Sequence, residues 1–209
     1  DGVVMAVRSG RISEERIDRS VLKILEVKKE LGLWQEKIVS IDHARETRGN
    51  WSHKASAENA ARKSITMVKD EAGNIPISPG ESRRLNHILL ATDEGMLSYS
   101  RPFRSAISRL HGNVDSQFHY QPLTEDQILN IVANADSSDH NLVTLLIRVR
   151  MNIGSITIDL SHRALIDRLQ EAGKKVTVVS FGSPYVTDVD GIGTYLAAYG
   201  YSSVSMNAM

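Results

Sequence analysis

The sequence predicts an α/β fold, a three-layer αβα sandwich around a mostly parallel sheet. After Pro79, apolar runs alternate with amphipathic helical segments, which is typical of a series of βαβ units. Two of the runs, LVTLLIR at 142–148 and VTVVSF at 176–181, are nearly continuous rather than alternating. Such runs indicate strands that are covered on both faces, as the strands of a parallel sheet are.

Residues 1–34 are expected to form two helices that precede this sandwich. The stretch DGVVMAVR already has helical apolar spacing and leads to Gly10, so the chain begins inside an element and we expect a fragment. Ser13, followed by two glutamates, caps a second helix that ends at Gly32. Its apolar stripe must pack against a large partner, and consists of Ile17, Val21, Ile24, Leu25 and Leu31.

A linker at 35–51 and the sandwich domain at 52–209 complete the predicted organisation. The linker, QEKIVSIDHARETRGNW, has no sustained period. The elements expected in the domain are helices at 52–64, 99–112, 124–135 and 161–173, strands at 65–70, 73–78, 87–93, 113–120, 141–150 and 174–182, and a final helix truncated at 209. Thr124 and Ser161 are the expected caps of the last two complete helices.

Composition excludes several classes of function. Lys+Arg and Asp+Glu each number 25 and the hydrophobic fraction is 41%, as in an ordinary globular protein. The chain has no excess of basic residues of the kind that is typical of nucleic-acid-binding proteins. The longest apolar run, at 142–147, is far shorter than the ~20 residues of a membrane-spanning helix. The chain has no cysteine, which excludes disulfides, thiolate metal sites and a cysteine nucleophile.

Acidic clusters near predicted strand ends offer weak candidates for chemistry. Asp93 and Glu94 follow a strand and could act as acid/base groups or metal ligands, but a helix-capping turn explains them better. Asp136, Asp139 and His140 have a spacing that a metal could use, but a solvated loop is the better interpretation. The seven histidines show no i,i+4 pair on a helix, so the sequence predicts neither a metal site nor a cofactor.

The connection RVRMNIGSITIDLS at 148–161 is the strongest candidate for contact with a ligand. It is the longest connection of the sandwich and follows the most buried strand, so Arg148, Arg150 and Asn152 are expected to face a neighbouring surface or a substrate. Guanidinium forks suit carboxylates, phosphates and sugar hydroxyls. The turn FGSPY at 181–185 is expected to be structural, and no phosphate-loop or nucleophile-elbow pattern is present. This chemistry alone identifies no enzyme.

Three longer stretches resemble glycoside hydrolase family 3. AVRSGRISEERIDRSVLKILEVKKELGLW resembles the last helix of that family's barrel domain and its continuation. SHKASAENAARKSITMVKDEAGNIPIS resembles the start of its second domain, and VTVVSFGSPYVTDVDGIGTYLAAYGYSSVSMNA the closing strand, turn and tyrosine-rich segment. The resemblance implies a (β/α)8-type barrel followed by the αβα sandwich, with 1–34 as the C-terminal helices of a missing barrel that is this chain's own partner domain.

The resemblance also implies an activity, the retaining hydrolysis of β-linked glycosides through an aspartate nucleophile in the barrel. That aspartate would lie upstream of residue 1, so no catalytic residue is expected in this chain. In β-glucosidase-like members, a glutamate on a sandwich loop is the acid/base, and by position that loop is 148–161, which here holds only Asp159. This departure, together with KKELGLW, favours the β-N-acetylhexosaminidase branch, where a histidine-aspartate pair on a barrel loop takes the role.

The expected substrate is therefore terminal N-acetylglucosamine of peptidoglycan or chitin-type oligosaccharides. One alternative is a non-catalytic interaction module of an inactive family member, with a possible homodimer through the helix at 13–31. A weaker alternative is a receiver-like or flavodoxin-like domain that uses Asp93. The sequence leaves the cellular compartment open.

Overall fold

The computed structural model describes residues 2–78, 84–149, 157–185 and 189–209. The chain divides into two compact units, residues 1–53 and 54–209, and each is described by itself. The division into barrel helices at 1–34, a linker at 35–51 and a sandwich domain at 52–209 stays a prediction.

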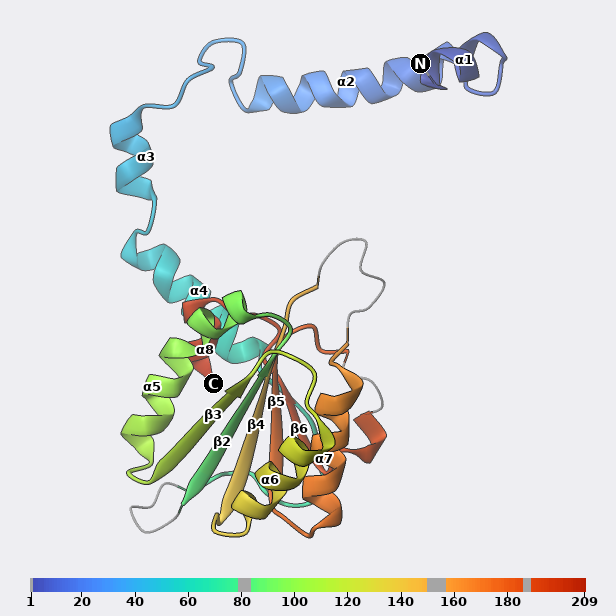
Figure 1. The fold of residues 1–209 in the computed structure, drawn as a ribbon. Helices are drawn as coiled ribbons and strands as arrows, with labels where there is room; N and C mark the ends of the chain where they lie inside the picture. The colour runs from blue at the N-terminus through green and yellow to red at the C-terminus, as the bar shows by residue number, and fades with distance from the viewer. Residues whose placement is uncertain (1, 79–83, 150–156, 186–188) are drawn as a thin grey trace. The chain divides into compact units, whose positions relative to one another are not determined.

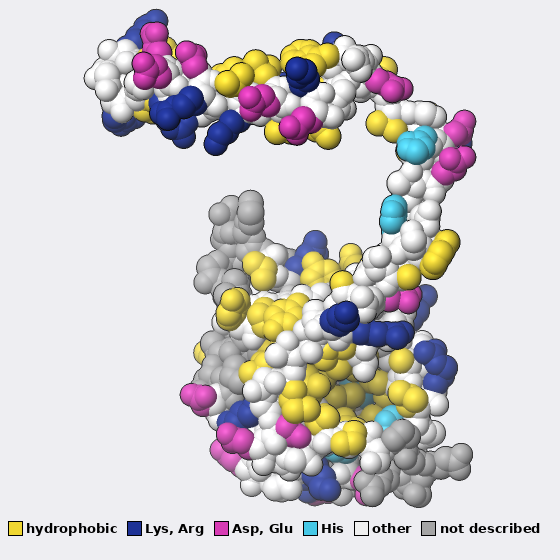
Figure 2. Space-filling model, turned by 180° about the vertical axis from the view of Figure 1, so that it is seen from behind, with side chains coloured by type: hydrophobic (Ala, Val, Ile, Leu, Met, Phe, Trp, Pro, Cys, Tyr) yellow, Lys and Arg dark blue, Asp and Glu magenta, His cyan; other side chains and the backbone are white. Residues whose placement is uncertain are grey.

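The first unit consists of helices whose ends match the predicted caps. They are α1 (Gly2–Arg8), α2 (Glu14–Glu30) and α3 (Ile41–Thr47), the last within the predicted linker (Figure 1). The Ser13 hydroxyl accepts the backbone N–H of Arg16 at 3.2 Å, and Gly32 takes the positive φ that ends α2. No residue of α2 is buried, and Figure 2 shows hydrophobic side chains exposed along it among charged ones. The apolar stripe of α2 therefore lies open to solvent within this unit.

The second unit contains a six-stranded sheet in the order β1-β6-β5-β4-β2-β3. Its strands are β1 (Thr66–Asp70), β2 (Leu85–Ala91), β3 (Val114–His119), β4 (His140–Ile147), β5 (Val176–Gly182) and β6 (Thr194–Ala197). Its helices are α4 (Trp51–Ser64), which begins just before the unit, η1 (Glu94–Ser100), α5 (Arg101–Leu110), α6 (Glu125–Ala135), α7 (Leu160–Glu171), η2 (Val189–Gly191) and α8 (Ser203–Ala208). Only the β1–β6 pair is antiparallel among these strands, which confirms the mostly parallel sheet.

Helices cover both faces of the sheet, which confirms the predicted sandwich. Helices α6 and α7 lie over one face, and α5 and α8 over the other (Figure 1). Strand β4 sends Val143 and Leu145 into the first layer and Leu142 and Leu146 into the second. All residues at 141–147 are buried, as the continuous apolar run predicts, because neighbouring strands and both helical layers enclose this strand.

Two expectations about local structure are wrong, and one strand was not predicted. The segment 73–78 is not a strand, because the Asp70 carboxylate accepts the N–H groups of Asn74 (2.8 Å) and Ile75 (3.3 Å) and closes a turn. Helix α7 begins at Leu160 with Asp159, not Ser161, as its N-cap. Strand β6 went unpredicted because it is four residues long within a glycine- and tyrosine-rich stretch.

The turn after β5 depends on Gly182. Its φ is +99°, and a Cβ there would lie 2.1 Å from the carbonyl oxygen of Ile147. Gly173 also has a positive φ, +70°, but a Cβ there would meet nothing within 4 Å. We expect Gly173→Ala to lose about 1–2 kcal/mol of unfolding free energy from backbone strain alone, and Gly182→Ala to lose clearly more. Denaturant unfolding of both variants measures the loss of unfolding free energy. Equal losses in the two variants would contradict the close approach of Gly182 to the Ile147 carbonyl oxygen.

Acid should destabilise the sandwich through His87. This buried side chain lies on β2 with Nε2 3.0 Å from the Thr144 hydroxyl and Nδ1 3.4 Å from that of Ser116. Burial first, then the positive charge of Arg104, lowers its pKa to about 4. Because the unfolded chain then takes up the proton first, stability should fall between about pH 6.5 and pH 4 and level off below, by roughly 3 kcal/mol in total.

The comparison of two variants isolates this contribution. His87→Gln should make the pH dependence of the unfolding free energy shallower over this range by about one proton. The matched variant His43→Gln, at an exposed position, should keep the wild-type slope. Identical slopes for the wild type and His87→Gln would mean that His87 is already charged in the folded protein.

Candidate functional site

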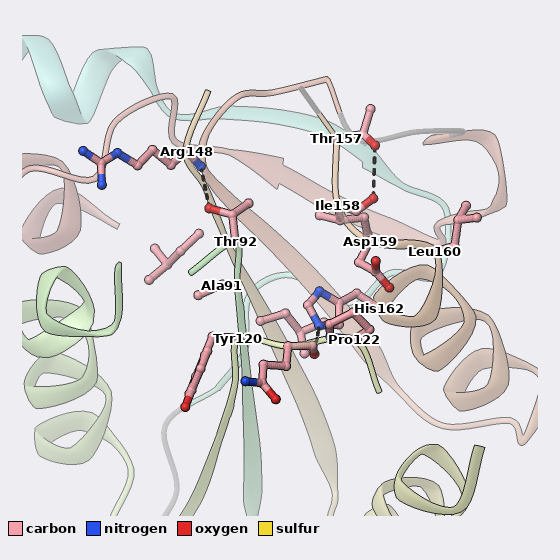
Figure 3. A pocket seen from close by; sticks show the side chains of 13 residues that line it. Ala91, Thr92, Tyr120, Pro122, Arg148, Thr157, Ile158, Asp159, Leu160 and His162 are labelled. Atoms are coloured by element: carbon pink, nitrogen blue, oxygen red, sulfur yellow. Dashed lines mark hydrogen bonds between the residues drawn. The ribbon is translucent and has the colours of Figure 1, made fainter. Parts of the chain in front are cut away.

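A cavity of about 460 Å³ opens at the carboxyl edge of the sheet. It is formed by residues 90–92 at the end of β2, residues 120–122 after β3, Leu146 and Arg148 at the end of β4, and residues 157–160 with His162 at the start of α7 (Figure 3). Ligands of parallel α/β sheets bind at this edge, because the loops that follow neighbouring strands meet there.

The cavity has an apolar floor and polar groups at its rim. Leu90, Leu146 and Ile158 are buried beneath it. Tyr120 is partly exposed and lies at the rim, where it offers a ring face and a hydroxyl. An aromatic face beside hydrogen-bonding groups suits a ligand that is apolar on one side and hydroxylated at its edges.

Arg148, which the sequence predicts to face a substrate or a neighbouring surface, lines this cavity, and that role stays a prediction. Its backbone N–H donates to the Thr92 hydroxyl at 3.2 Å, which ties the end of β4 to the end of β2. The side chain is exposed, and in Figure 3 the guanidinium extends away from Asp159 and His162. Arg150 and Asn152, the other two predicted contact residues, lie outside the described residues.

The Asp159 carboxylate is engaged in capping helix α7. Its Oδ1 accepts the backbone N–H of Ser161 at 2.8 Å and the hydroxyl of the same residue. The hydroxyl hydrogen bond contributes most to lowering the pKa of Asp159 below its ordinary value. Asp159 is therefore ionised at neutral pH and holds its charge at the helix start, where the helix dipole also favours it.

His162 supports the wall of the cavity. It is 4% exposed, and its ring Nε2–H donates to the Gln121 carbonyl at 3.1 Å, which joins α7 to the segment after β3. Burial lowers its pKa, so the ring is neutral near pH 7. Sequence reasoning missed both Tyr120 and His162. Tyr120 directly follows β3 and could have been found by its place at a strand end, but nothing in the local sequence marks His162.

The acidic candidates do not converge on this cavity. Asp93 is the N-cap residue of the short helix η1 and Glu94 its first residue, but the Asp93 side chain makes no capping hydrogen bond to this helix. Asp136 pairs with Lys174, and the Asp139 carboxylate accepts the backbone N–H of Arg84 at 2.8 Å, at the amino edge of the sheet. Within the described ranges, no three His, Asp or Glu side chains are grouped so that they could hold a metal ion. Nor does any helix in those ranges have the length and apolar character that crossing a membrane requires.

Comparisons with known proteins relate the chain to glycosidases. No model of a known protein family matches it. Beta-glucosidase C of Emericella nidulans is 29% identical over 135 residues, which are 56% of this chain and 21% of the relative. The beta-N-acetylglucosaminidase/beta-glucosidase of Cellulomonas fimi is 38% identical over 72 residues, or 34% of this chain and 13% of the relative. The chain thus matches well under half the length of these relatives.

Solved structures extend the likeness to almost the whole chain. A beta-glucoside phosphorylase has 26% identity and a TM-score of 0.71, and the match covers 98% of this chain and 37% of that one. A glycoside hydrolase family 3 beta-N-acetylglucosaminidase from Paenibacillus shares the fold with a TM-score of 0.60 and 22% identity, over 98% of this chain and 38% of that one. Together with the sequence relatives, these likenesses relate the chain to the C-terminal-domain region of glycosidases of glycoside hydrolase family 3.

Proposed function

We propose that this chain belongs to a retaining β-N-acetylglucosaminidase that releases terminal N-acetylglucosamine from peptidoglycan or chitin-type oligosaccharides. The nucleophile and the acid/base lie upstream of residue 1 in a barrel domain, and the chain by itself has no turnover. The observation that carries this proposal is the absence of a proton donor from the connection at 148–161.

The argument rests on the carboxylates of that connection. Its sequence, RVRMNIGSITIDLS, contains one, Asp159, and no glutamate. A general acid must hold a proton before it donates one, so its pKa has to lie near the working pH. Because Asp159 caps α7 and its pKa is lowered, it is unsuited to this role. The proton donor must then come from another part of the protein, as in the branch of the family that uses a histidine-aspartate pair on the barrel.

The relatives support the cleavage of β-linked glycosides more strongly than the choice of sugar. The name of the Cellulomonas relative includes both N-acetylglucosaminides and glucosides, whereas those of the Emericella relative and the phosphorylase include glucosides alone. The choice of N-acetylglucosamine therefore depends on the missing glutamate rather than on overall similarity.

The cavity at the carboxyl edge is proposed to form a wall of the substrate site. Arg148 and Tyr120 lie at its rim, where they can donate to sugar hydroxyls and cover a sugar face. Arg150 and Asn152 follow in the same connection and are proposed to extend this wall.

Substrate preference tests the proposal directly. The complete protein, including its upstream domain, is assayed with 4-nitrophenyl β-N-acetylglucosaminide and the matching β-glucoside. We expect kcat/KM to favour the N-acetylglucosaminide by at least about tenfold, the range that pocket contacts with one substituent supply. A preference for the glucoside would contradict the proposal. Formation of a sugar 1-phosphate only when inorganic phosphate is added would replace hydrolysis by phosphorolysis, and no turnover at all would favour the non-catalytic module.

Two substitutions separate substrate contact from proton donation. Arg148→Ala should lower kcat/KM by about tenfold, mainly through KM, because a charged hydrogen bond to substrate is lost. Asp159→Asn should leave kcat unchanged, because asparagine caps a helix as well as aspartate does.

The matched control is Arg168→Ala, which removes a surface arginine that pairs with Glu125 at 3.1 Å on α6, and it should leave both constants unchanged. A fall of kcat by about 10²-fold or more in Asp159→Asn would instead make Asp159 the general acid. An Arg148→Ala variant with wild-type kinetics would remove Arg148 from the substrate site.

A further inference from the structure

A second cavity, of about 190 Å³, lies at the opposite edge of the sheet. It is lined by parts of the segment 73–78, by Arg84 and Leu85 at the start of β2, by His111 after α5, and by residues 139–140 and Lys175 at the starts of β4 and β5. The parallel strands begin here, at the lower end of the sheet in Figure 1, so the sheet separates this cavity from the candidate substrate site.

Basic groups from four different segments meet in this cavity. They are the guanidinium of Arg84, the imidazoles of His111 and His140, and the ammonium of Lys175. Burial first, and then the charges of Lys175 and His111, lower the pKa of His140 to about 4, so this ring is neutral near pH 7.

Several of these donors are available to a ligand. His111 is 8% exposed, and its ring has no hydrogen-bond partner within the part of the chain that the structure describes. Lys175 is exposed and pairs with no carboxylate among the described residues, whereas neighbouring Lys174 pairs with Asp136. His140 already forms a hydrogen bond between its Nε2 and the Thr177 hydroxyl at 2.8 Å. That nitrogen is therefore not available to a ligand, although the ring still forms part of the cavity wall.

The acidic groups nearby are already engaged. Asp139 lines the cavity, and its Oδ2 accepts the backbone N–H of Arg84 at 2.8 Å. Asp115 accepts one nitrogen of the Arg84 guanidinium at 3.3 Å, which orients the side chain and leaves its other N–H groups for a ligand. The cavity therefore has free donors, while in formal charge its two cations, Arg84 and Lys175, are balanced by the carboxylates of Asp115 and Asp139.

We propose that this cavity binds a small oxyanion of the phosphate class, either inorganic phosphate or the phosphate group of a sugar phosphate. An oxyanion accepts hydrogen bonds at several oxygens, and Arg84, His111 and Lys175 supply donors of the type that bind phosphate in proteins. The volume suits a phosphate group and is much smaller than that of the cavity at the carboxyl edge. This site is separate from the proposed glycosidase site and does not depend on it.

Calorimetric titration of the complete protein with inorganic phosphate, at constant ionic strength, tests the proposal. We expect saturable binding that Lys175→Gln weakens by at least about tenfold, since a charge-assisted contact is lost. Lys174→Gln changes the same charge one residue away and should leave the affinity unchanged. Lys175 is exposed, so its replacement should leave the fold intact, which the unfolding midpoint verifies.

A further variant tests which edge of the sheet binds phosphate. Arg148→Ala removes the cation at the carboxyl edge and should not alter phosphate affinity. Loss of binding in Arg148→Ala with retention in Lys175→Gln would assign phosphate to the carboxyl edge and overturn this proposal, while leaving the glycosidase proposal open to its own assay. Absence of saturable binding, or equal weakening by Lys174→Gln and Lys175→Gln, would also overturn it.

Titration with glucose 1-phosphate distinguishes the two sources of the phosphate group. Binding at least as tight as that of inorganic phosphate, and again weakened by Lys175→Gln, supports the site as one for a sugar phosphate. Binding of inorganic phosphate alone supports it as a site for the free anion.

Discussion

The parallel pairing of the buried strand β4 with β2 and β5 is the constraint on which the rest of the sandwich depends. Parallel neighbours cannot be joined by a tight hairpin, so each connection must cross a face of the sheet, usually as a helix. These crossings cover both faces, which is why residues 141–147 are buried and why only Asn141 and Thr144 among them are polar. The same crossings bring all the loops to two edges, and each of the two cavities lies at one of those edges.

The two edges differ in the chemistry that they offer. At the carboxyl edge, Arg148, Tyr120 and the start of α7 surround an open cavity, and the acid of the long connection is engaged as a helix cap. At the amino edge, Arg84, His111 and Lys175 line a smaller cavity and bring hydrogen-bond donors to it. A group that caps a helix has its charge stabilised, which is the opposite of what proton donation needs. The role of Asp159 in the fold thus limits its role in chemistry.

The family likeness identifies the architecture more sharply than the substrate. Solved structures with this arrangement include a beta-glucoside phosphorylase and a beta-N-acetylglucosaminidase, so the sandwich by itself does not choose between sugars. Specificity resides in particular side chains placed on a shared fold. Under the proposed function, the informative feature of this chain is a missing residue type, because the connection at 148–161 contains no glutamate and its one carboxylate, Asp159, caps a helix.

The sequence by itself determined the fold class, the buried strands β4 and β5, the caps Ser13 and Thr124, and the place of Arg148 at a strand end. These features follow from the apolar periodicity, the helix caps and the order of strands, all of which can be recognised in short stretches of sequence. Only the tertiary structure decided that 73–78 turns instead of pairing, that residues 194–197 form β6, and that Asp159 rather than Ser161 caps α7. It also decided which basic groups meet around Lys175. Such features depend on partners distant along the chain, whose approach is set by how the strands assemble.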